Sequence, residues 1–383
     1  MSASRWARFD VNRVSTPCFV IDEVQLADNL RILDQVQVQG GARILLALKA
    51  FASRCVAPLL MQTLGGTAAS GLFEARLGRQ GFGGELHTFC VAFREDELAE
   101  VLELSDHVIF NSASQWQRFG AAAQDAAVSC GLRVNPRCGA APQVMYDPCQ
   151  PRSRLGVVAE SLGELVTDGL SGVHVHALCE QGLPALERAV TAVEQQFAPL
   201  LERAQWLNLG GGHLITAPGY DVAGLIRLVD TLTQRYDVQI YLEPGEAVVL
   251  NAGILVSEVL DTTWNEGSIA ILDASPTCHT PDVLEAPYRP EILHAGEPGS
   301  RDHDYRLAGA TCLAGDVFGD YSFANPLGIG DRIVFLDQAP YTIVKTNSFN
   351  GIPLPSIAVW NSATDELREI ERFGYVEYAG RLR

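Results

Sequence analysis

A lysine follows a short apolar run near the start of the sequence. Residues 43–48 are almost all apolar, as expected of a buried strand, and Lys49 stands where that strand should end. Burying an ammonium group without a partner costs several kcal/mol, so a lysine in this place is usually neutralised, paired or used chemically. The alternative is a lysine that reaches from a strand end to the solvent, and the neighbouring motifs decide between the two.

Three later apolar runs end in groups that could act together with a lysine. VHVHALCE carries His176 and Glu180, LNLGGGH carries Gly210, Gly211 and Gly212, and YLEPGEA carries Glu243 and Gly245. Consecutive glycines let backbone N–H groups approach an anion without obstruction from side chains. A carboxylate at the end of an apolar strand is desolvated, so it needs a proton or a cationic partner.

Each of these groups has an ordinary structural explanation, namely a flexible turn, a structural ion pair or a core histidine. A lysine, an anion-binding loop and a buried acid together are better explained by pyridoxal 5'-phosphate. In this interpretation Lys49 forms the Schiff base and the three glycines bind the phosphate. Glu243 faces the pyridine nitrogen, and His176 lies against the ring.

These motifs belong to a repeating strand–helix pattern. Amphipathic stretches such as 54–64, 72–80 and 222–236 lie between most of the strand candidates. Eight strands with intervening helices predict an α/β fold, a (β/α)8 barrel of the TIM type, in which chemistry gathers at the carboxyl ends of the strands. A doubly wound open sheet is the alternative, but no G-x-G-x-x-G stands at a first strand–helix turn. The eight candidates are 43–48, 67–70, 86–91, 107–111, 131–135, 172–177, 206–209 and 239–243.

The sequence changes character after Pro244. Short β-rich runs, among them 248–260, 268–272 and 332–336, are separated by Gly, Pro and Asn, and no long helical period appears. We therefore predict a barrel that binds pyridoxal phosphate over residues 16–246. A β-rich C-terminal domain is predicted over residues 247–383, joined by residues 1–15.

The composition narrows the range of partners. The 383 residues carry 28 basic and 46 acidic side chains, a formal charge of −18, so nucleic acid and anionic membranes are poor partners. The nine cysteines include no C-x-x-C pair, which argues against a disulfide framework or a structural metal site and for a reducing cytoplasm. No secretory h-region and no run of about 18 apolar residues is present, so no membrane association is expected.

Motifs along nearly the whole chain resemble those of the fold-type III pyridoxal-phosphate decarboxylases, whose barrel is of the alanine racemase type. In chain order they are ALKAF around Lys49, LRVNP at Arg133, SRLG at 153–156, HALCE at 176–180, LGGGH, EPGEA, TCLAGD at 311–316 and APYTIVKTNSFNG at 339–351. Within this family the chain most resembles the carboxynorspermidine/carboxyspermidine decarboxylase branch.

The resemblance implies a homodimer with two shared active sites. Tyr341 resembles the tyrosine that reaches the cofactor phosphate, and Cys312 resembles the cysteine that the partner subunit supplies as a proton donor after carbon dioxide leaves. Two departures from the ornithine and diaminopimelate enzymes, Glu246 after E-P-G and Leu313 after the cysteine, favour the carboxynorspermidine branch. The candidates for binding the distal amines of a carboxylated polyamine are Glu180, Asp282, Glu285 and Asp316.

We therefore expect decarboxylation of carboxynorspermidine or carboxyspermidine to norspermidine or spermidine, a step of polyamine biosynthesis. A decarboxylase of the diaminopimelate or ornithine type is the main alternative. Racemases of this fold generally set an arginine against the pyridine nitrogen, so Glu243 speaks against racemisation. A non-catalytic homologue would be expected to lose Lys49 or Cys312, and both are present.

Overall fold

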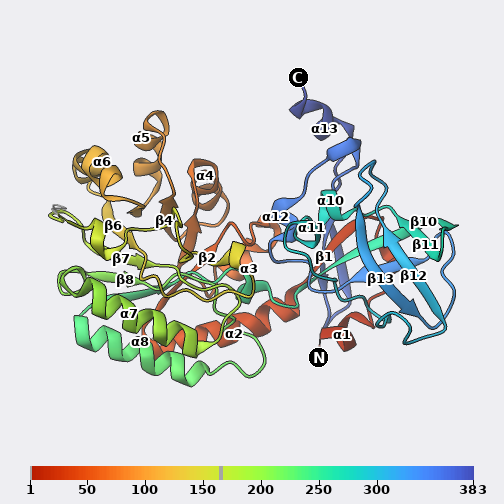
Figure 1. Ribbon diagram of the computed structural model, residues 1–383, viewed down its shortest axis with the longest axis horizontal. Helices are drawn as coiled ribbons and strands as arrows, with labels where there is room; N and C mark the ends of the chain where they lie inside the picture. Colours follow the sequence, from red (N-terminus) through yellow and green to blue (C-terminus); the bar gives the residue numbers. More distant parts are fainter. Residues whose placement is uncertain (1, 164–166) are drawn as a thin grey trace. The chain divides into compact units, whose positions relative to one another are not determined.

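Figure 1 shows the computed structural model, which describes residues 2–163 and 167–383. Its internal contacts divide the chain into two compact units. One unit is Asp28–Val248, and the other combines Met1–Ala27 with Val249–Arg383.

The first unit is built on a closed barrel of eight parallel strands, which confirms the predicted fold. All eight predicted strands are present within two residues of their expected bounds. The first and last strands close the barrel, with Arg43 opposite Tyr241 and Ile44 opposite Leu242. The strands are β2 (Arg43–Ala47), β3 (Gly66–Ala69), β4 (Glu85–Cys90), β5 (His107–Phe110), β6 (Ser129–Val134), β7 (Gly172–Val175), β8 (Trp206–Asn208) and β9 (Gln239–Leu242).

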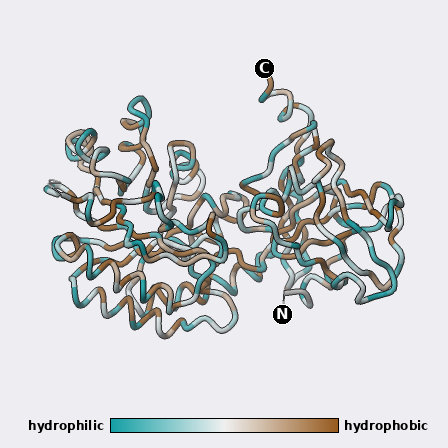
Figure 2. Tube along the Cα trace, in the orientation of Figure 1, coloured by the Kyte–Doolittle hydropathy of each residue, from teal (hydrophilic) through white to brown (hydrophobic). Residues whose placement is uncertain are grey.

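Helices connect most of these strands and bury one apolar face each against them. In α7, for example, Leu186, Val190 and Val193 are buried at helical spacing. Along α7 and α8 in Figure 2, teal and brown segments alternate, as in helices with one apolar face. The longer helices of this unit are α2 (Glu23–Gly40), whose first turn belongs to the other unit, α4 (Leu72–Gly81), α5 (Glu95–Leu104), α6 (Ala113–Asp125), α7 (Leu183–Leu201) and α8 (Val222–Tyr236).

Two connections differ from the regular pattern. The helix predicted over 54–64 is reduced to a 3-10 turn, Arg54–Val56, and the short helix α3 (Ala57–Leu60), which has a proline at its start. Between β6 and β7 the described residues contain only the 3-10 turns Val144–Tyr146 and Ala159–Ser161. Short helix α9 (Glu246–Val249) follows the last barrel strand.

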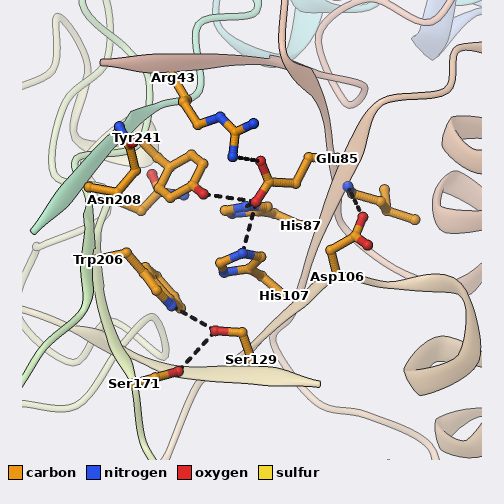
Figure 3. A network of polar contacts seen from close by, with 12 residues as sticks. Arg43, Glu85, His87, Asp106, His107, Ser129, Ser171, Trp206, Asn208 and Tyr241 are labelled. Atoms are coloured by element: carbon orange, nitrogen blue, oxygen red, sulfur yellow. Dashed lines mark hydrogen bonds and ion pairs between the residues drawn. The ribbon is translucent and has the colours of Figure 1, made fainter. Parts of the chain in front are cut away.

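A polar network ties four strands together at the amino end of the barrel (Figure 3). The Oε1 atom of Glu85 accepts a hydrogen bond from the Tyr241 hydroxyl at 2.8 Å and lies 2.9 Å from Nε2 of His107. Its Oε2 atom lies 2.8 Å from the Arg43 guanidinium. Because Arg43 and Tyr241 belong to the strands that close the barrel, the Glu85 carboxylate reinforces that closure.

Glu85, His87 and His107 also form the one group of three potential metal ligands found among the described residues, with ligand atoms within 4.8 Å of one another. Their geometry argues against chelation. The imidazole rings of His87 and His107 are stacked, with centroids 4.0 Å apart and planes 17° apart. Their in-plane lone pairs therefore run side by side instead of converging on one ion. The arrangement suits a hydrogen-bonded cluster.

The second unit is built on an eight-stranded sheet. Its strand order is β13-β12-β11-β10-β1-β15-β16, and β14 pairs with β10. Strands β13 and β16 were not expected from the sequence. The strands are β1 (Cys18–Asp22), β10 (Gly253–Trp264), β11 (Ser268–Leu272), β12 (His303–Ala308), β13 (Val317–Phe323), β14 (Arg332–Phe335), β15 (Ser356–Asn361) and β16 (Glu366–Glu371).

Strand β1 corrects the predicted start of the barrel domain at residue 16. It pairs antiparallel with β10, where Cys18 faces Val256, and parallel with β15, where Cys18 faces Ser356. The strand is therefore a central member of the second sheet, and all five of its residues are buried. Its partners lie more than 230 residues away in the chain, so the local sequence could not reveal this pairing.

Five short helices complete the second unit. One of them is α11 (Asp282–Glu285), which carries two of the predicted substrate acids. The others are α1 (Ser2–Trp6), α10 (Pro276–His279), α12 (Thr342–Lys345) and α13 (Tyr375–Arg381).

Candidate active site

Lys49 stands in a turn two residues after β2, at the carboxyl end of the barrel. Backbone bonds hold the turn: Leu48 N–H donates to Ala68 O at 3.0 Å, and Ala50 N–H donates to Ala47 O at 3.0 Å. The Lys49 side chain is reached by solvent, yet protein surrounds it closely enough that desolvation lowers its pKa, with the Arg133 guanidinium adding to the effect. Lys49 therefore offers a more readily deprotonated amine than an ordinary lysine does.

The glycine loop after β8 is pressed against the loops that follow β7 and β9. A Cβ atom on Gly211 would lie 2.2 Å from the Glu243 carbonyl oxygen, and one on Gly212 would lie 1.9 Å from the Leu178 carbonyl oxygen. Gly212 also has a φ of +82°, which side-chain-bearing residues rarely adopt. Its N–H donates to no group among the described residues, so it is available to an anion.

Glu243 follows β9 and is held by two side chains from neighbouring strands. Asn208 Nδ2 donates to its Oε1 at 2.7 Å, and His174 Nε2 contacts its Oε2 at 3.4 Å. Burial raises the pKa of Glu243, but the interactions with His174 and the positive potential of Lys49 outweigh this and bring the pKa to about 2. Glu243 is therefore a carboxylate anion at neutral pH.

His176 is tied to the glycine loop. Its Nδ1 atom accepts a hydrogen bond from the Gly211 N–H at 2.9 Å, so we assign the ring proton to Nε2. Burial, followed by the charges of Lys49 and Arg133, holds the pKa of His176 well below its usual value. The imidazole is therefore neutral, as a group that packs against a flat ring should be.

Arg133, His174 and Asn208 were not among the site residues predicted from the sequence. His174 is 2% exposed and Arg133 is 5% exposed, and Arg133 donates to the His176 carbonyl oxygen at 3.1 Å. The sequence could have indicated two of them, His174 and Asn208, through strand periodicity. His174 and Asn208 stand two residues before His176 and Gly210, and side chains two apart on a strand face the same side.

Two further predicted residues lie beside the glycine loop. Gly245 lets the loop after β9 approach the lysine turn, because a Cβ atom there would lie 2.3 Å from the Ala50 Cβ. Glu180 is exposed, with a φ of +53°, and the N–H of the next residue, Gln181, donates to Gly212 O at 2.9 Å. The barrel unit thus brings together six predicted features: Lys49, His176, Glu180, the three glycines, Glu243 and Gly245.

The second unit brings Asp282 and Glu285 together, but not as free acids. The Lys345 ammonium lies 2.5 Å from Asp282 Oδ1 and 2.5 Å from Glu285 Oε2. One cation therefore bridges two carboxylates, which leaves the group with a net charge of −1.

Asp316 requires a correction. It was predicted to bind substrate, but it is 2% exposed. Oδ1 accepts hydrogen bonds from Ser275 and from the N–H and hydroxyl of Thr277, and Oδ2 accepts from the N–H and hydroxyl of Thr311. We therefore assign Asp316 a structural role: its carboxylate fixes the loop that carries Cys312. The sequence could not show this, because Ser275 and Thr277 lie about 40 residues away.

Cys312 and Tyr341 also belong to the second unit. Cys312 is exposed, and its N–H donates to Asn350 Oδ1 at 2.8 Å. Tyr341 is half-buried and precedes α12 with a φ of +58°. Both remain candidates on the strength of the sequence resemblance.

The barrel residues fit pyridoxal phosphate. They supply a readily deprotonated amine at Lys49, an unpaired N–H at Gly212, a neutral imidazole at His176 and an ionised carboxylate at Glu243. A closed parallel barrel with such a site, joined in one chain to a separate β-sheet unit, defines the class of barrel enzymes that use pyridoxal phosphate.

Comparison with known proteins narrows this class. Residues 18–339 match the family model described as "Pyridoxal-dependent decarboxylase, C-terminal sheet domain". The chain is 41% identical to carboxynorspermidine/carboxyspermidine decarboxylase from Campylobacter jejuni, over 96% of this chain and 98% of that protein. It is also 41% identical to carboxyaminopropylagmatine decarboxylase from Synechocystis, over 97% and 96% of the two chains.

A solved structure agrees with these relatives. The crystal structure of carboxynorspermidine decarboxylase from Campylobacter jejuni, complexed with norspermidine, superposes with a TM-score of 0.89 at 40% identity. The match covers 96% of this chain and 100% of that one. The chain belongs to the pyridoxal-dependent decarboxylase family, as its motifs indicated. None of the helices in the described part of the chain has both the length and the apolar character needed to cross a membrane.

Proposed function

We propose that this protein uses pyridoxal phosphate to decarboxylate a carboxylated triamine of the carboxynorspermidine or carboxyspermidine type in the cytoplasm. The observation that carries the proposal is the ionised Glu243 carboxylate, held by Asn208 and His174 within the same barrel end as Lys49. An anion at this place favours a protonated pyridine ring. Relatives of the same length that bear these names support the substrate class.

The cofactor, when bound, supplies an electron sink for the pair of electrons left by the departing carboxylate. Lys49 holds the cofactor through its amine. Glu243 keeps a proton on the pyridine nitrogen, and His176 supports the flat face of the ring. Gly212 offers the phosphate its backbone N–H, whereas the N–H groups of Gly210 and Gly211 donate to Asn208 and His176. These two glycines keep side chains out of the phosphate site, which Gly245 and Tyr341 complete.

Cys312 is proposed to deliver the proton that replaces the lost carboxylate. In this proposal two copies of the chain form a homodimer, and each copy supplies Cys312 to the barrel of the other. The exposure of Cys312 supports this role, because a proton donor for a partner's site must lie at a surface.

The distal amines of the substrate are proposed to meet Glu180, Asp282 and Glu285. Because Lys345 already neutralises one of the two charges on Asp282 and Glu285, that pair has room for one substrate ammonium. A second distal amine then requires another partner, and the exposed Glu180 beside the glycine loop is available for it.

The experiment is a product assay on purified enzyme supplied with pyridoxal phosphate. Carboxynorspermidine, carboxyspermidine, carboxyaminopropylagmatine, ornithine and diaminopimelate are offered separately, and the amines formed are separated by chromatography. Norspermidine or spermidine formation is expected. Efficient turnover of ornithine or diaminopimelate, with no turnover of the carboxylated triamines, would reject the substrate class. Exclusive turnover of the agmatine derivative would place the chain with its Synechocystis relative.

A further inference from the structure

Three side chains from the barrel strands β4, β6 and β7 contact one another in a series that ends at Glu243. The Arg133 guanidinium lies 4.6 Å from the centroid of the Phe89 ring. The Phe89 ring also stacks with the His174 imidazole, with 5.7 Å between the ring centroids and 23° between the ring planes. His174 in turn contacts the Glu243 carboxylate at 3.4 Å. The Phe89 ring thus contacts both the buried cation Arg133 and the imidazole that faces the Glu243 anion.

The surroundings of His174 fix where its proton lies. Its Nε2 atom faces Glu243, whereas its Nδ1 atom is buried and has no hydrogen-bond partner among the described residues. A proton added at Nδ1 would place an unsatisfied N–H and a positive charge in the barrel interior, close to Arg133. The geometry therefore favours a neutral ring that carries its hydrogen on Nε2.

Burial and the charged groups around His174 together lower its pKa, although Glu243 opposes them. Glu243 would favour a second proton, but burial is the largest influence and lowers the pKa of His174, and the charges of Arg133 and Lys49 lower it further. The remaining titratable neighbours are His176, which interacts with His174, and His87, which interacts with Glu243.

We propose that His174 is a positioning residue, which donates its Nε2–H to Glu243 as a neutral imidazole and is kept neutral by its burial together with the nearby charge of Arg133. Asn208 occupies the other carboxylate oxygen, also as a neutral donor. With two neutral donors the full negative charge of Glu243 stays available to the ring nitrogen of the cofactor. An imidazolium at position 174 would instead compete for that charge. This inference rests on the proposed function.

The first test follows the protonation of His174 directly, in protein labelled with 15N-histidine. The eight histidines of the chain make assignment by the His174→Gln variant practical. Nitrogen chemical shifts are recorded from about pH 5.5 to 8.5, with and without pyridoxal phosphate. In the wild type, His174 should remain the neutral Nε2–H form throughout. In Arg133→Met the pKa of His174 should rise, so that protonation begins at a higher pH than in the wild type, whereas in Arg133→Lys, which keeps the charge, it should not.

Matched controls separate charge from packing. Arg137→Met removes an exposed arginine that pairs with Glu160, so it should leave the protonation state of His174 unchanged. Titration of His174 in the wild type, or no difference between Arg133→Met and Arg133→Lys, would overturn the proposal. A wild type that binds no cofactor would instead overturn the proposed function, while the shifts measured without cofactor would still decide the state of His174.

A second test asks whether the donated hydrogen matters. His174→Gln keeps a neutral N–H donor, whereas His174→Leu keeps volume and loses the donor. Affinity for pyridoxal phosphate, measured by equilibrium dialysis, should fall about tenfold or more in the leucine variant, the range expected for a lost hydrogen bond to a charged group. It should stay within about threefold of the wild type in the glutamine variant. Equal loss in both variants, or no loss in the leucine variant, would reject the positioning role.

Discussion

The ammonium nitrogen of Lys345 lies 2.5 Å from the Oδ1 atom of Asp282, across two helices of one turn each, α12 and α11. Glu285 accepts from the same nitrogen. Burial alone would lower the pKa of Lys345, but these two carboxylates outweigh it and raise the pKa. Lys345 is therefore a fixed cation inside the group of acids that the sequence suggested for substrate amines.

This relationship gives a test of what the acids do. Asp282→Asn should raise the KM for carboxynorspermidine about tenfold or more, because a desolvated ammonium loses its charged partner. Cofactor absorbance should not change. Repeating the substitution in a Lys345→Met background separates two roles. If Asp282 serves only to hold Lys345, the effect on KM disappears in that background, and direct binding of the substrate is then ruled out.

Lys49→Ala should abolish attachment of pyridoxal phosphate and all decarboxylation. The chain contains only two lysines, Lys49 and Lys345, so the assignment is simple. Reduction with borohydride in the presence of cofactor, followed by peptide mass spectrometry, should label Lys49 in the wild type and in Lys345→Met. Label on Lys345, or a cofactor absorbance band that persists in dialysed Lys49→Ala, would contradict this.

Glu243→Gln should bind the cofactor but decarboxylate more slowly by about 100-fold or more, because the ring nitrogen loses its charged partner. The pKa of Glu243 is about 2, so its charge is constant from pH 5 to 9. Any pH dependence of kcat in that range must then come from another group and should persist in Glu243→Gln. Steady-state rates of both proteins, measured across this pH range, test the slower decarboxylation and the origin of the pH dependence. Turnover of Glu243→Gln at the wild-type rate would show that Glu243 has only a structural role.

The Glu85 cluster should make the fold sensitive to acid. Burial lowers the pKa of His87 from 6.5 to about 4, so between these values the unfolded chain binds a proton that the folded chain does not. Stability should therefore fall as the pH drops through this window. Burial raises the pKa of Glu85, but the bonds from His107, His87 and Tyr241 outweigh it and lower the pKa, so a second loss follows at lower pH.

Substitution in the same cluster should be costly at neutral pH. Glu85→Gln weakens the link to Arg43 and leaves buried donors less well paired, so the free energy of unfolding should fall by about 2–3 kcal/mol. Urea titration measures this. Glu160→Gln, which breaks an exposed pair with Arg137, should cost less than about 1 kcal/mol. Equal effects of the two substitutions would show that the cluster does not stabilise barrel closure.

Mixing the inactive variants Lys49→Ala and Cys312→Ala should restore part of the activity if the site is shared between subunits. Each mixed dimer can then contain one site with both residues intact, so recovery has a ceiling of about a quarter of wild-type activity in a symmetric dimer. Subunit exchange must be verified by native mass spectrometry. Complete exchange without recovery would argue that Cys312 does not act across an interface.

The sequence predicted the barrel well because the relevant patterns are local. Eight short apolar runs, most of them separated by amphipathic stretches, were enough to place Lys49, the glycine loop and Glu243 at strand ends. Strand β1 and Asp316 were misjudged, because their environments are set by residues that are remote in the chain. His174 and Asn208 were missed for another reason: their importance depends on which carboxylate they face, and strand periodicity gives only the side of the strand.

The ion pair of Lys345 affects which amine of the chain can react with an aldehyde. Pyridoxal phosphate is an aldehyde, and in free solution it condenses with any accessible uncharged amine. Of the 28 basic side chains, 26 are arginines, which do not form such adducts, and one of the two lysines is held as an ammonium between two acids. Apart from the α-amine, the only amine left to react is Lys49. With the cofactor of the proposed function, the chain would therefore direct pyridoxal phosphate to a single lysine, because its surface carries no other uncharged lysine that competes for the aldehyde.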